Sequence, residues 1–206
     1  MSWRSAVAES TSAARLRVIL GSGSPRRREL LSNLGLAFVV APADIDETEH
    51  PGEAPIPYVH RLAIEKAMAV DAADDDIVIA ADTTVDVDGA IFAKPLDDDD
   101  ARRMLRVLSG RDHLVHTGLA VRHGGRVASD VVTTVVTMSR LSPEMLEWYV
   151  GTGEPHGKAG AYAMQGSAAV LVSGVQGSVS NVIGLPMTML ATLLARAGVP
   201  LPTLLT

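Results

Sequence analysis

Residues 21–30 read Gly-Ser-Gly-Ser-Pro-Arg-Arg-Arg-Glu-Leu and come directly after the apolar run Val18-Ile19-Leu20. This order predicts a strand, a tight turn and a helix, in which Ser24 is the N-cap and Pro25 takes the first helical position. The start of a helix carries unpaired N–H groups and the positive end of the helix dipole, which together favour an anion. Three arginines on the first turn suit that position when the anion is strongly charged, so the segment predicts a phosphate site.

Arginines on a first turn are also common on a solvated helix face, and the segment alone leaves this alternative open. The segment matches neither of two widespread phosphate motifs. A P-loop has Gly-Lys-Ser or Gly-Lys-Thr after its glycines, and the dinucleotide-binding fingerprint has a third glycine where the arginines stand here. The phosphate site therefore needs support from elsewhere in the chain.

Composition limits the classes of protein to which the chain belongs. It has 206 residues, 47% of them hydrophobic, a formal net charge of -6 and no cysteine. A negatively charged chain does not present a general nucleic-acid or anionic-membrane surface, and the lack of cysteine excludes disulfides, thiolate metal sites and a cysteine nucleophile. We expect a flexible leader over residues 1–14, which have no apolar core of signal-peptide length, and a single domain over 15–206. No apolar run approaches the ~20 residues that cross a bilayer, and the lack of cysteine fits a cytoplasmic protein.

Strand-like and helix-like runs alternate along the chain, which predicts an α/β protein with a mixed twisted sheet flanked by helices. Strand–helix units come first and a long hairpin through Gly124-Gly125 comes later, so we expect two lobes with a central cleft. Residues 42–57 form a polar, acidic loop, and loops of that length are often functional. The expected strands are 16–21, 37–41, 77–81, the hairpin 85–93, 114–122, 126–138 and 168–172, and the expected helices are 25–34, 57–72, 97–108 and the stretches that begin at Ser142 and Pro186.

Asp82 and Thr83 come directly after the apolar run 77–81. Polar residues at the carboxyl ends of sheet strands line ligand clefts in α/β proteins. A half-buried carboxylate there suits a general base or a ligand of a hard cation, and a turn-forming aspartate is the simpler alternative. Lys66 and Lys94 flank this segment in the sequence, and a lysine is a suitable point charge for a phosphate.

Three further segments carry polar residues of interest. Several carboxylates, Glu47 among them, crowd the acidic loop; they suit Mg²⁺ or Mn²⁺, and a solvated loop is equally consistent with them. In the glycine-rich segment 157–166, Gln165 offers a donor and an acceptor that suit the edge of a nucleobase. Residues 181–186 are expected to form a loop into the last helix, with Asn181 as a turn former.

In this order, the segments resemble the Maf proteins, a family of nucleoside triphosphate pyrophosphatases also described as septum-formation inhibitors. The resemblance is collinear from Val18 to Gly198, and the combination of motifs is specific although each motif is modest alone. The matching motifs are Ser22-x-Ser24-Pro25-Arg26-Arg27, Asp44-x-Asp46-Glu47, Arg61-Leu62-Ala63-x-x-Lys66-Ala67, Ala81-Asp82-Thr83, Gly89 through Lys94-Pro95, Leu108-Ser109-Gly110, His116-Thr117-Gly118, Gly153-Glu154-Pro155, Lys158 through Gly166, and Asn181 through Pro186.

The resemblance implies a fold shared with the inosine-triphosphate pyrophosphatases. It also implies hydrolysis between the α and β phosphates of a nucleoside triphosphate, which yields a nucleoside monophosphate and pyrophosphate. A divalent cation, Mg²⁺ or Mn²⁺, is implied as cofactor, together with a cytoplasmic protein that is often a homodimer. No nucleic-acid polymer and no membrane are expected as partners.

Site residues follow from the resemblance motif by motif. Asp82 matches the acidic catalytic residue. Arg26, Thr83 and Gln165 match the positions that set nucleotide preference, and they are similar to the branch of the family that acts on dTTP and UTP. The branch acting on 7-methyl-GTP has Asp-Gln in place of Asp-Thr and a glutamate in the late segment. The polar groups that line the cleft match Ser24, Arg27, Lys66 and Lys94.

The mechanism implied by these matches is a hypothesis with one open choice. Arg26, Arg27 and the helix start hold the triphosphate, and Lys66 and Lys94 stabilise the pyrophosphate leaving group. Asp82 orients or deprotonates the attacking water, or it holds the metal that does so, with Glu47 as a second metal contact. The competing hypothesis is a nucleotide-binding regulator of septum formation that acts through a protein partner.

Overall fold

The computed structural model describes residues 16–205. The flexible leader expected over residues 1–14 lies outside the described residues. Within 16–205, no helix is both long and apolar enough to span a membrane.

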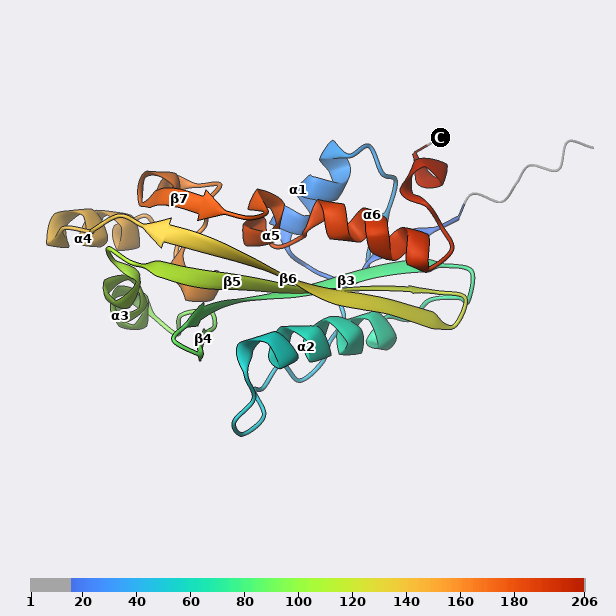
Figure 1. The fold of residues 1–206 in the computed structure, drawn as a ribbon, viewed down its shortest axis with the longest axis horizontal. Helices are drawn as coiled ribbons and strands as arrows, with labels where there is room; N and C mark the ends of the chain where they lie inside the picture. Colours follow the sequence, from blue (N-terminus) through green and yellow to red (C-terminus); the bar gives the residue numbers. More distant parts are fainter. Residues whose placement is uncertain (1–15, 206) are drawn as a thin grey trace, which may run out of the picture.

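One mixed sheet runs through the described chain (Figure 1). Its strand order is β2-β1-β3-β5-β6-β7, and β4 pairs with β3 off this path. The pairs β2–β1 and β1–β3 are parallel, and all the other pairs are antiparallel. The strands are β1 (Val18–Leu20), β2 (Val39–Val40), β3 (Ile77–Val87), β4 (Ala90–Phe92), β5 (Asp112–His123), β6 (Arg126–Met138) and β7 (Val172–Gln176).

Strand β3 is the part of the sheet that positions the site. Its first three residues, 77–79, pair with β1, and its last three, 85–87, pair with β4 on the same edge. Between them, residues 80–84 pair only with β5 on the opposite edge. The sheet therefore has an opening on one edge of β3, between the end of β1 and the β3–β4 hairpin.

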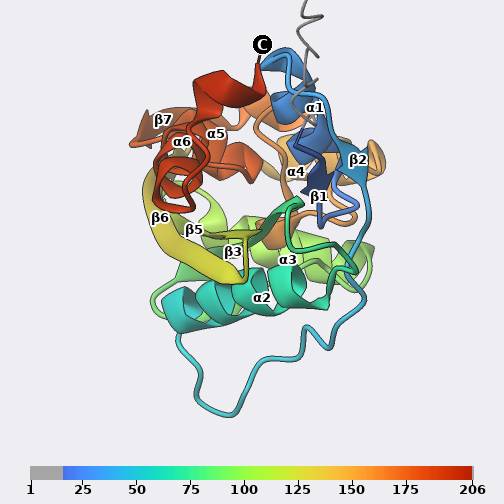
Figure 2. The same cartoon turned by 90° about the vertical axis from the view of Figure 1, so that its right-hand side faces the viewer.

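Helices cover both faces of the sheet and divide it into two lobes (Figures 1 and 2). Helix α2 lies below β3 and β5, whereas α1, α5 and α6 lie above; this end is the α1–α6 lobe. Helices α3 and α4 pack around the other end, which is the α3–α4 lobe, and each lobe has its own buried apolar cluster. The helices are α1 (Pro25–Asn33), α2 (Pro55–Ala69), α3 (Asp98–Leu108), α4 (Pro143–Gly151), α5 (Val179–Ile183) and α6 (Met187–Arg196), with short 3₁₀ turns at Ala159–Ala161, Ser167–Val170 and Leu201–Leu204.

Gly118 on β5 lets α2 approach the sheet closely. A Cβ atom at this position would lie 2.1 Å from the carbonyl oxygen of Val59 on α2. No side chain other than hydrogen fits there, because backbone atoms cannot move aside as a flexible side chain can. The close approach holds the first half of α2 against β5, and further along the helix Lys66 reaches Asp82 on β3.

The structure confirms the expected mixed α/β sheet with flanking helices, and it corrects three local expectations. The strand expected at 77–81 continues to Val87 as β3, so Asp82 and Thr83 lie within the strand and not at its end. The strand expected at 168–172 is wrong: Ser167–Val170 is a 3₁₀ turn, and the strand starts at Val172. The cause is distant in sequence, since the Glu154 carboxylate accepts hydrogen bonds from the N–H groups of Ser167 and Ala168.

The loop expected from residue 181 is the third correction. Residues Val179–Ile183 form helix α5, with Ser178 as its N-cap and Gly184 ending it at a φ of 118°. Asn181 is therefore a buried helical residue and no turn former.

Candidate active site

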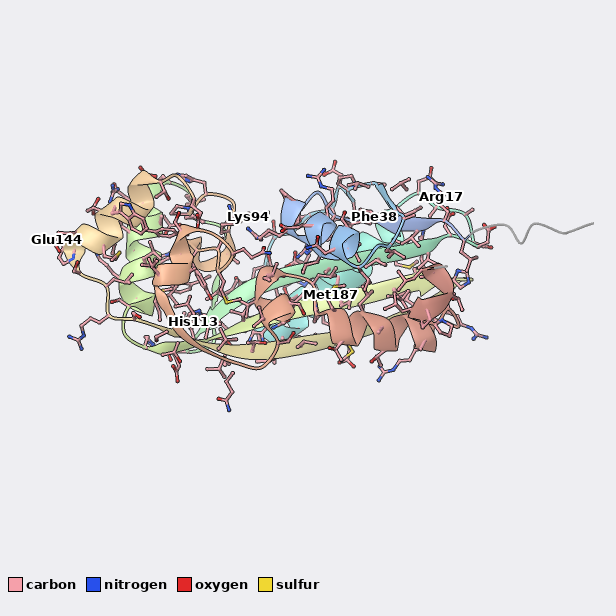
Figure 3. All side chains as sticks on the ribbon, turned by 90° about the horizontal axis from the view of Figure 1, so that it is seen from above. Arg17, Phe38, Lys94, His113, Glu144 and Met187 are labelled. Carbon is pink, nitrogen blue, oxygen red and sulfur yellow. The ribbon has the colours of Figure 1, made fainter. Side chains whose placement is uncertain are left out.

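A cleft of about 860 Å³ opens at the unpaired stretch of β3, between the two lobes. Figure 3 shows Lys94 between the lobe that carries Glu144 and the lobe that carries Phe38. The structure brings every site residue expected from the sequence to this cleft. They are Ser24, Arg26, Arg27, Glu47, Lys66, Asp82, Thr83, Lys94 and Gln165.

A chain of alternating charges forms one wall of the cleft. The Lys66 ammonium lies 2.6 Å from Oδ1 of Asp82 and 2.7 Å from Oε1 of Glu47. The second oxygen of Glu47 lies 3.7 Å from Nζ of Lys94. The side chains of Lys66 and Asp82 are 9% and 12% exposed, whereas that of Lys94 is 65% exposed. Lys66 and Asp82 thus form a buried ion pair, whereas the ammonium of Lys94 is accessible to a ligand.

The loop that delivers Glu47 is tied to α2. Tyr58 donates a hydrogen bond to the carbonyl oxygen of Glu47 at 3.0 Å, and burial, with Asp82 and Glu47 nearby, raises the pKa of Tyr58 to about 12. Arg61 donates to both carboxylate oxygens of Glu53 at 2.7 and 2.8 Å and also to the carbonyl of Thr48. Hydrogen bonding to Arg61 lowers the pKa of Glu53 to about 2. The acidic loop is therefore held by α2 through specific hydrogen bonds.

Arg27 lies buried behind the cleft with no carboxylate partner among its hydrogen bonds. Its guanidinium donates to the carbonyl of Gly184 (2.8 Å), to Oγ of Ser22 (2.8 Å) and to Oγ1 of Thr83 (3.1 Å). Burial lowers the pKa of Arg27, and the nearby charge of Asp82 opposes that shift. Neutral acceptors orient the cation without neutralising it, so its charge favours an anion in the cleft.

The start of α1 has the expected phosphate-site geometry. Ser24 caps the helix through a hydrogen bond from the N–H of Arg27 at 3.5 Å. Arg26 is half-buried, donates to the carbonyl of Ile183 at 3.3 Å and has its pKa lowered mainly by burial. Arg28 is exposed and does not line the cleft. The arginine run therefore splits into two cleft residues and one solvated residue, as the motif match implies.

Asp82 and Thr83 are adjacent in β3 and so point to opposite faces of the sheet. Asp82 faces α2 and meets Lys66, whereas Thr83 faces α1 and α5. Behind Thr83, its Oγ1 lies 2.9 Å from Oγ1 of Thr117 on β5, which donates to the carbonyl of Asn181 at 3.0 Å. The cleft therefore has polar groups from both faces of the sheet, because the edge of β3 is unpaired at residues 80–84.

Gln165 is exposed and lines the cleft. Its segment is held by Tyr149 and Glu154, to which the sequence assigned no role. Tyr149 accepts a hydrogen bond from the N–H of Ala163 at 3.3 Å and donates to Glu154 at 3.0 Å. Glu154 in turn holds the N–H of Ser167 at 2.7 Å. The Gly-Glu-Pro motif was visible in the sequence, but the partners of its glutamate lie 13 and 14 residues further along or on helix α4.

Lys158 is a second cleft residue to which the sequence reasoning gave no role. Its ammonium donates to the carbonyl of His156 at 3.1 Å. Burial, followed by the charge of Arg26, lowers the pKa of Lys158. The signal that could have found it is a cation placed inside a glycine-rich loop. Lys158 and Arg26 thus give this side of the cleft two positive charges.

Two carboxylates on the charged wall suit a divalent cation in part. Within residues 16–205 no three His, Asp or Glu side chains converge as a resident metal site would need. Asp82 and Glu47 do approach a common point, which Lys66 Nζ occupies. A Mg²⁺ would therefore meet the carboxylate oxygens that do not face Lys66, and such an ion is commonly bound through one or two carboxylates with substrate phosphates and water completing the shell.

One family model and several sequence relatives match most of the chain. The sequence model of a family described as Maf-like protein matches residues 17–197. The chain is 55% identical over 190 residues to a dTTP/UTP pyrophosphatase of Anaeromyxobacter dehalogenans strain 2CP-1, which covers 90% of this chain and 96% of that protein. It is 51% identical over 186 residues to a dTTP/UTP pyrophosphatase of Myxococcus xanthus, with 90% and 94% covered. Among solved structures, the Staphylococcus aureus Ham1 protein superposes with a TM-score of 0.44 at 14% identity over 59% of this chain and 71% of that one.

Proposed function

The chain belongs to the Maf family, and from this membership we propose that it is a nucleoside triphosphate pyrophosphatase acting on dTTP and UTP. The products are the nucleoside monophosphate and pyrophosphate. The observation that carries the proposal is the cleft at the open edge of β3, where the buried carboxylate of Asp82 pairs with Lys66 and the buried Arg27 has only neutral hydrogen-bond acceptors. Relatives about half identical over most of their length carry this same activity in their names.

The arginine and lysine side chains of the cleft and the N-terminus of α1 bind the substrate. Arg26 and the N–H groups at the capped helix end receive phosphate oxygens, and Arg27 supplies a fixed positive charge behind them. Lys94 is exposed at the rim and contacts the terminal phosphates. Lys66 lies deeper, between Glu47 and Asp82, and balances the charge that develops on the leaving pyrophosphate.

Hydrolysis requires water to attack the α-phosphorus in line with the bond to the bridging oxygen. A new P–O bond forms, the bond to the bridging oxygen breaks, and pyrophosphate leaves with the electron pair. Lys66 holds Oδ1 of Asp82, so Oδ2 is the oxygen that orients the water and takes its proton. Such positioning accounts for much of the rate gain in phosphoryl-transfer sites.

A divalent cation is part of this proposal, because Asp82 and Glu47 together fit the carboxylate share of a Mg²⁺ or Mn²⁺ shell. Bound with the nucleotide, the cation supplies charge neutralisation on the phosphates. The side chains themselves keep their tasks: Glu47 orients Lys66, and Asp82 holds the water. A homodimer and a cytoplasmic location stay predictions.

The test is a nucleotide panel with pyrophosphate detection, run with Mg²⁺, with Mn²⁺ and with chelator. We expect pyrophosphate release from dTTP and UTP above that from the other nucleotides, and only with the cation. An Asp82→Asn variant should fold and bind nucleotide yet lose at least about 100-fold in kcat. Tight nucleotide binding without release under either metal would instead favour a regulator that acts through a protein partner.

A further inference from the structure

Two motif segments take no part in the mechanism above, yet they meet directly behind Thr83. One is His116-Thr117-Gly118 on β5, and the other is the segment that begins with Asn181 on α5. Thr117 and Asn181 are both fully buried. Their hydroxyl and carbonyl groups form a hydrogen-bonded line that leads outward to the cleft.

The direction of each hydrogen bond in that line follows from counting hydrogens. A hydroxyl has one hydrogen and two lone pairs, and a carbonyl only accepts. Thr117 donates its hydrogen to the carbonyl of Asn181 at 3.0 Å, so it has none left for Thr83. Thr83 must therefore be the donor in the 2.9 Å contact between the two hydroxyls. Arg27 then donates to the same Thr83 oxygen at 3.1 Å.

The far end of the line is held in place, which keeps the Asn181 carbonyl within hydrogen-bond distance of Thr117. The side-chain amide of Asn181 donates to the carbonyl of Val115 and to Oγ1 of Thr134, each at 3.0 Å. Its backbone N–H donates to Oγ of Ser178, the N-cap of α5. Gly184 brings the end of α5 close to Thr83, because a Cβ there would lie 3.3 Å from Oγ1 of Thr83. The Asn181 carbonyl is thus a fixed acceptor.

Thr83 consequently has one lone pair left for a ligand and no hydrogen. Phosphate oxygens are acceptors, so they gain nothing from such an oxygen. The nucleoside part of dTTP and UTP does carry donors, namely the N3–H of the base and the 3′-hydroxyl of the sugar. We propose that Thr117 is a positioning residue that makes Thr83 an acceptor-only group, so that the cleft selects a hydrogen-bond donor on the nucleoside.

This inference rests on the proposed function and deepens it by stating which substrate group Thr83 meets. Two substrate pairs distinguish the two donors: UTP against CTP, whose N3 is an acceptor, and dTTP against its 3′-deoxy analogue. The variants are Thr117→Val, which keeps the shape and removes the hydroxyl, Thr117→Ser, which keeps the hydroxyl, Thr83→Val and the double Thr117→Val/Thr83→Val. Kd by calorimetry accompanies kcat/KM, so the result does not depend on turnover.

The wild type should prefer the donor-bearing member of one pair by about tenfold or more. Thr117→Val should lose most of that preference, because the freed Thr83 hydrogen can turn toward a ligand acceptor, and Thr117→Ser should restore it. The double variant should show the same substrate preference as Thr83→Val alone, because Thr117 acts through Thr83. Thr117→Ala replaces Thr117→Val if the latter does not fold.

The inference is overturned if a folded Thr117→Val or Thr117→Ala variant keeps the wild-type preference. It is also overturned if the effects of Thr117→Val and Thr83→Val on substrate preference add independently in the double variant. A wild type that binds both members of each nucleotide pair equally well overturns it too. A wild type that binds with the expected preference but releases no pyrophosphate contradicts the proposed function and leaves the role of Thr117 supported.

Discussion

The Nζ atom of Lys66 lies 2.6 Å from Oδ1 of Asp82, at the wall of the cleft where α2 packs on β3. Both side chains are mostly withdrawn from water, so each depends on the other for neutralisation. Glu47 adds a second carboxylate at 2.7 Å from the same ammonium. One lysine therefore holds together the proposed catalytic carboxylate and the acidic loop.

Replacing Lys66 by methionine should damage both stability and activity. Breaking a buried pair by removing one partner typically costs about 3–5 kcal/mol, because the remaining carboxylate is left unpaired. We expect a loss of stability of that order in urea denaturation and a fall of about 100-fold or more in kcat/KM.

Lys94→Met is the matched control for Lys66→Met. Lys94 lies 3.7 Å from Glu47 and is 65% exposed, so its removal should change the free energy of unfolding by less than about 1 kcal/mol. It should still raise KM through the lost phosphate contact. Equal stability losses in the two variants would contradict the distinction between an inner and an outer lysine.

Arg26→Ala and Arg28→Ala should differ although the residues are two positions apart on the same helix turn. Arg26 is half-buried and lines the cleft, whereas Arg28 is exposed outside it. We expect Arg26→Ala to raise KM for dTTP by about tenfold or more, since charge-assisted phosphate contacts are among the stronger hydrogen bonds. Arg28→Ala should leave KM within about twofold of the wild type, as surface changes usually do. A comparable KM increase in both would mean that the arginine run acts as a diffuse charge.

Local patterns in the sequence predicted much of the fold and of the charged wall. Three expected features depend only on neighbouring residues, and the structure has all three: the Ser24 cap, the apolar run before Asp82, and the hairpin expected at 85–93, which turns at Asp88-Gly89. The sheet faces of Asp82 and Thr83 follow from strand alternation once β3 is known to continue to Val87. The continuity of β3 from Ile77 to Val87 depends on its pairing with β5, and no local sequence pattern predicts that pairing.

What the sequence did not predict depends on hydrogen bonds between distant residues. Glu154 turns the chain at Ser167, and that contact replaced the expected strand with a 3₁₀ turn. Thr117 and Asn181 are 64 positions apart. Their motifs were visible in the sequence, but their joint role needed the packing of α5 on β5.

Gly118→Ala should be strongly destabilising because it forces α2 away from the sheet. The new Cβ would lie 2.1 Å from the carbonyl oxygen of Val59, a contact that only backbone movement relieves. Overpacking costs about 1–3 kcal/mol, and more where backbone must move. Gly151→Ala is the control, since no atom outside its own helix and its chain neighbours lies within 4 Å of its Cβ position and its φ is not positive. In thermal and urea unfolding, the Gly118→Ala variant should be clearly less stable than the Gly151→Ala variant. Equal stability of the two variants would refute the close approach of α2.

His113 should make the protein less stable in mild acid. Its Nε2 lies 2.7 Å from the hydroxyl of Tyr162, a cleft residue, and its Nδ1 is buried without a partner in the described part of the chain. Burial lowers the pKa of His113 from 6.5 to about 4; Asp112 opposes this shift, and Arg111 adds to it. A second proton on this ring would leave a buried N–H with no acceptor.

The sign of the effect follows from where the proton binds. Between pH 6.5 and about 4 the unfolded chain binds a proton at His113 that the folded protein does not. The stability contribution is therefore fully present above pH 6.5 and is lost as pH falls toward 4, by about 3 kcal/mol in total. His113→Gln does not titrate, so the difference in unfolding free energy between wild type and variant should shift by that order from about pH 7 to about pH 4. A difference independent of pH in urea titrations would show that His113 accepts its second proton in the folded protein as readily as in the unfolded chain.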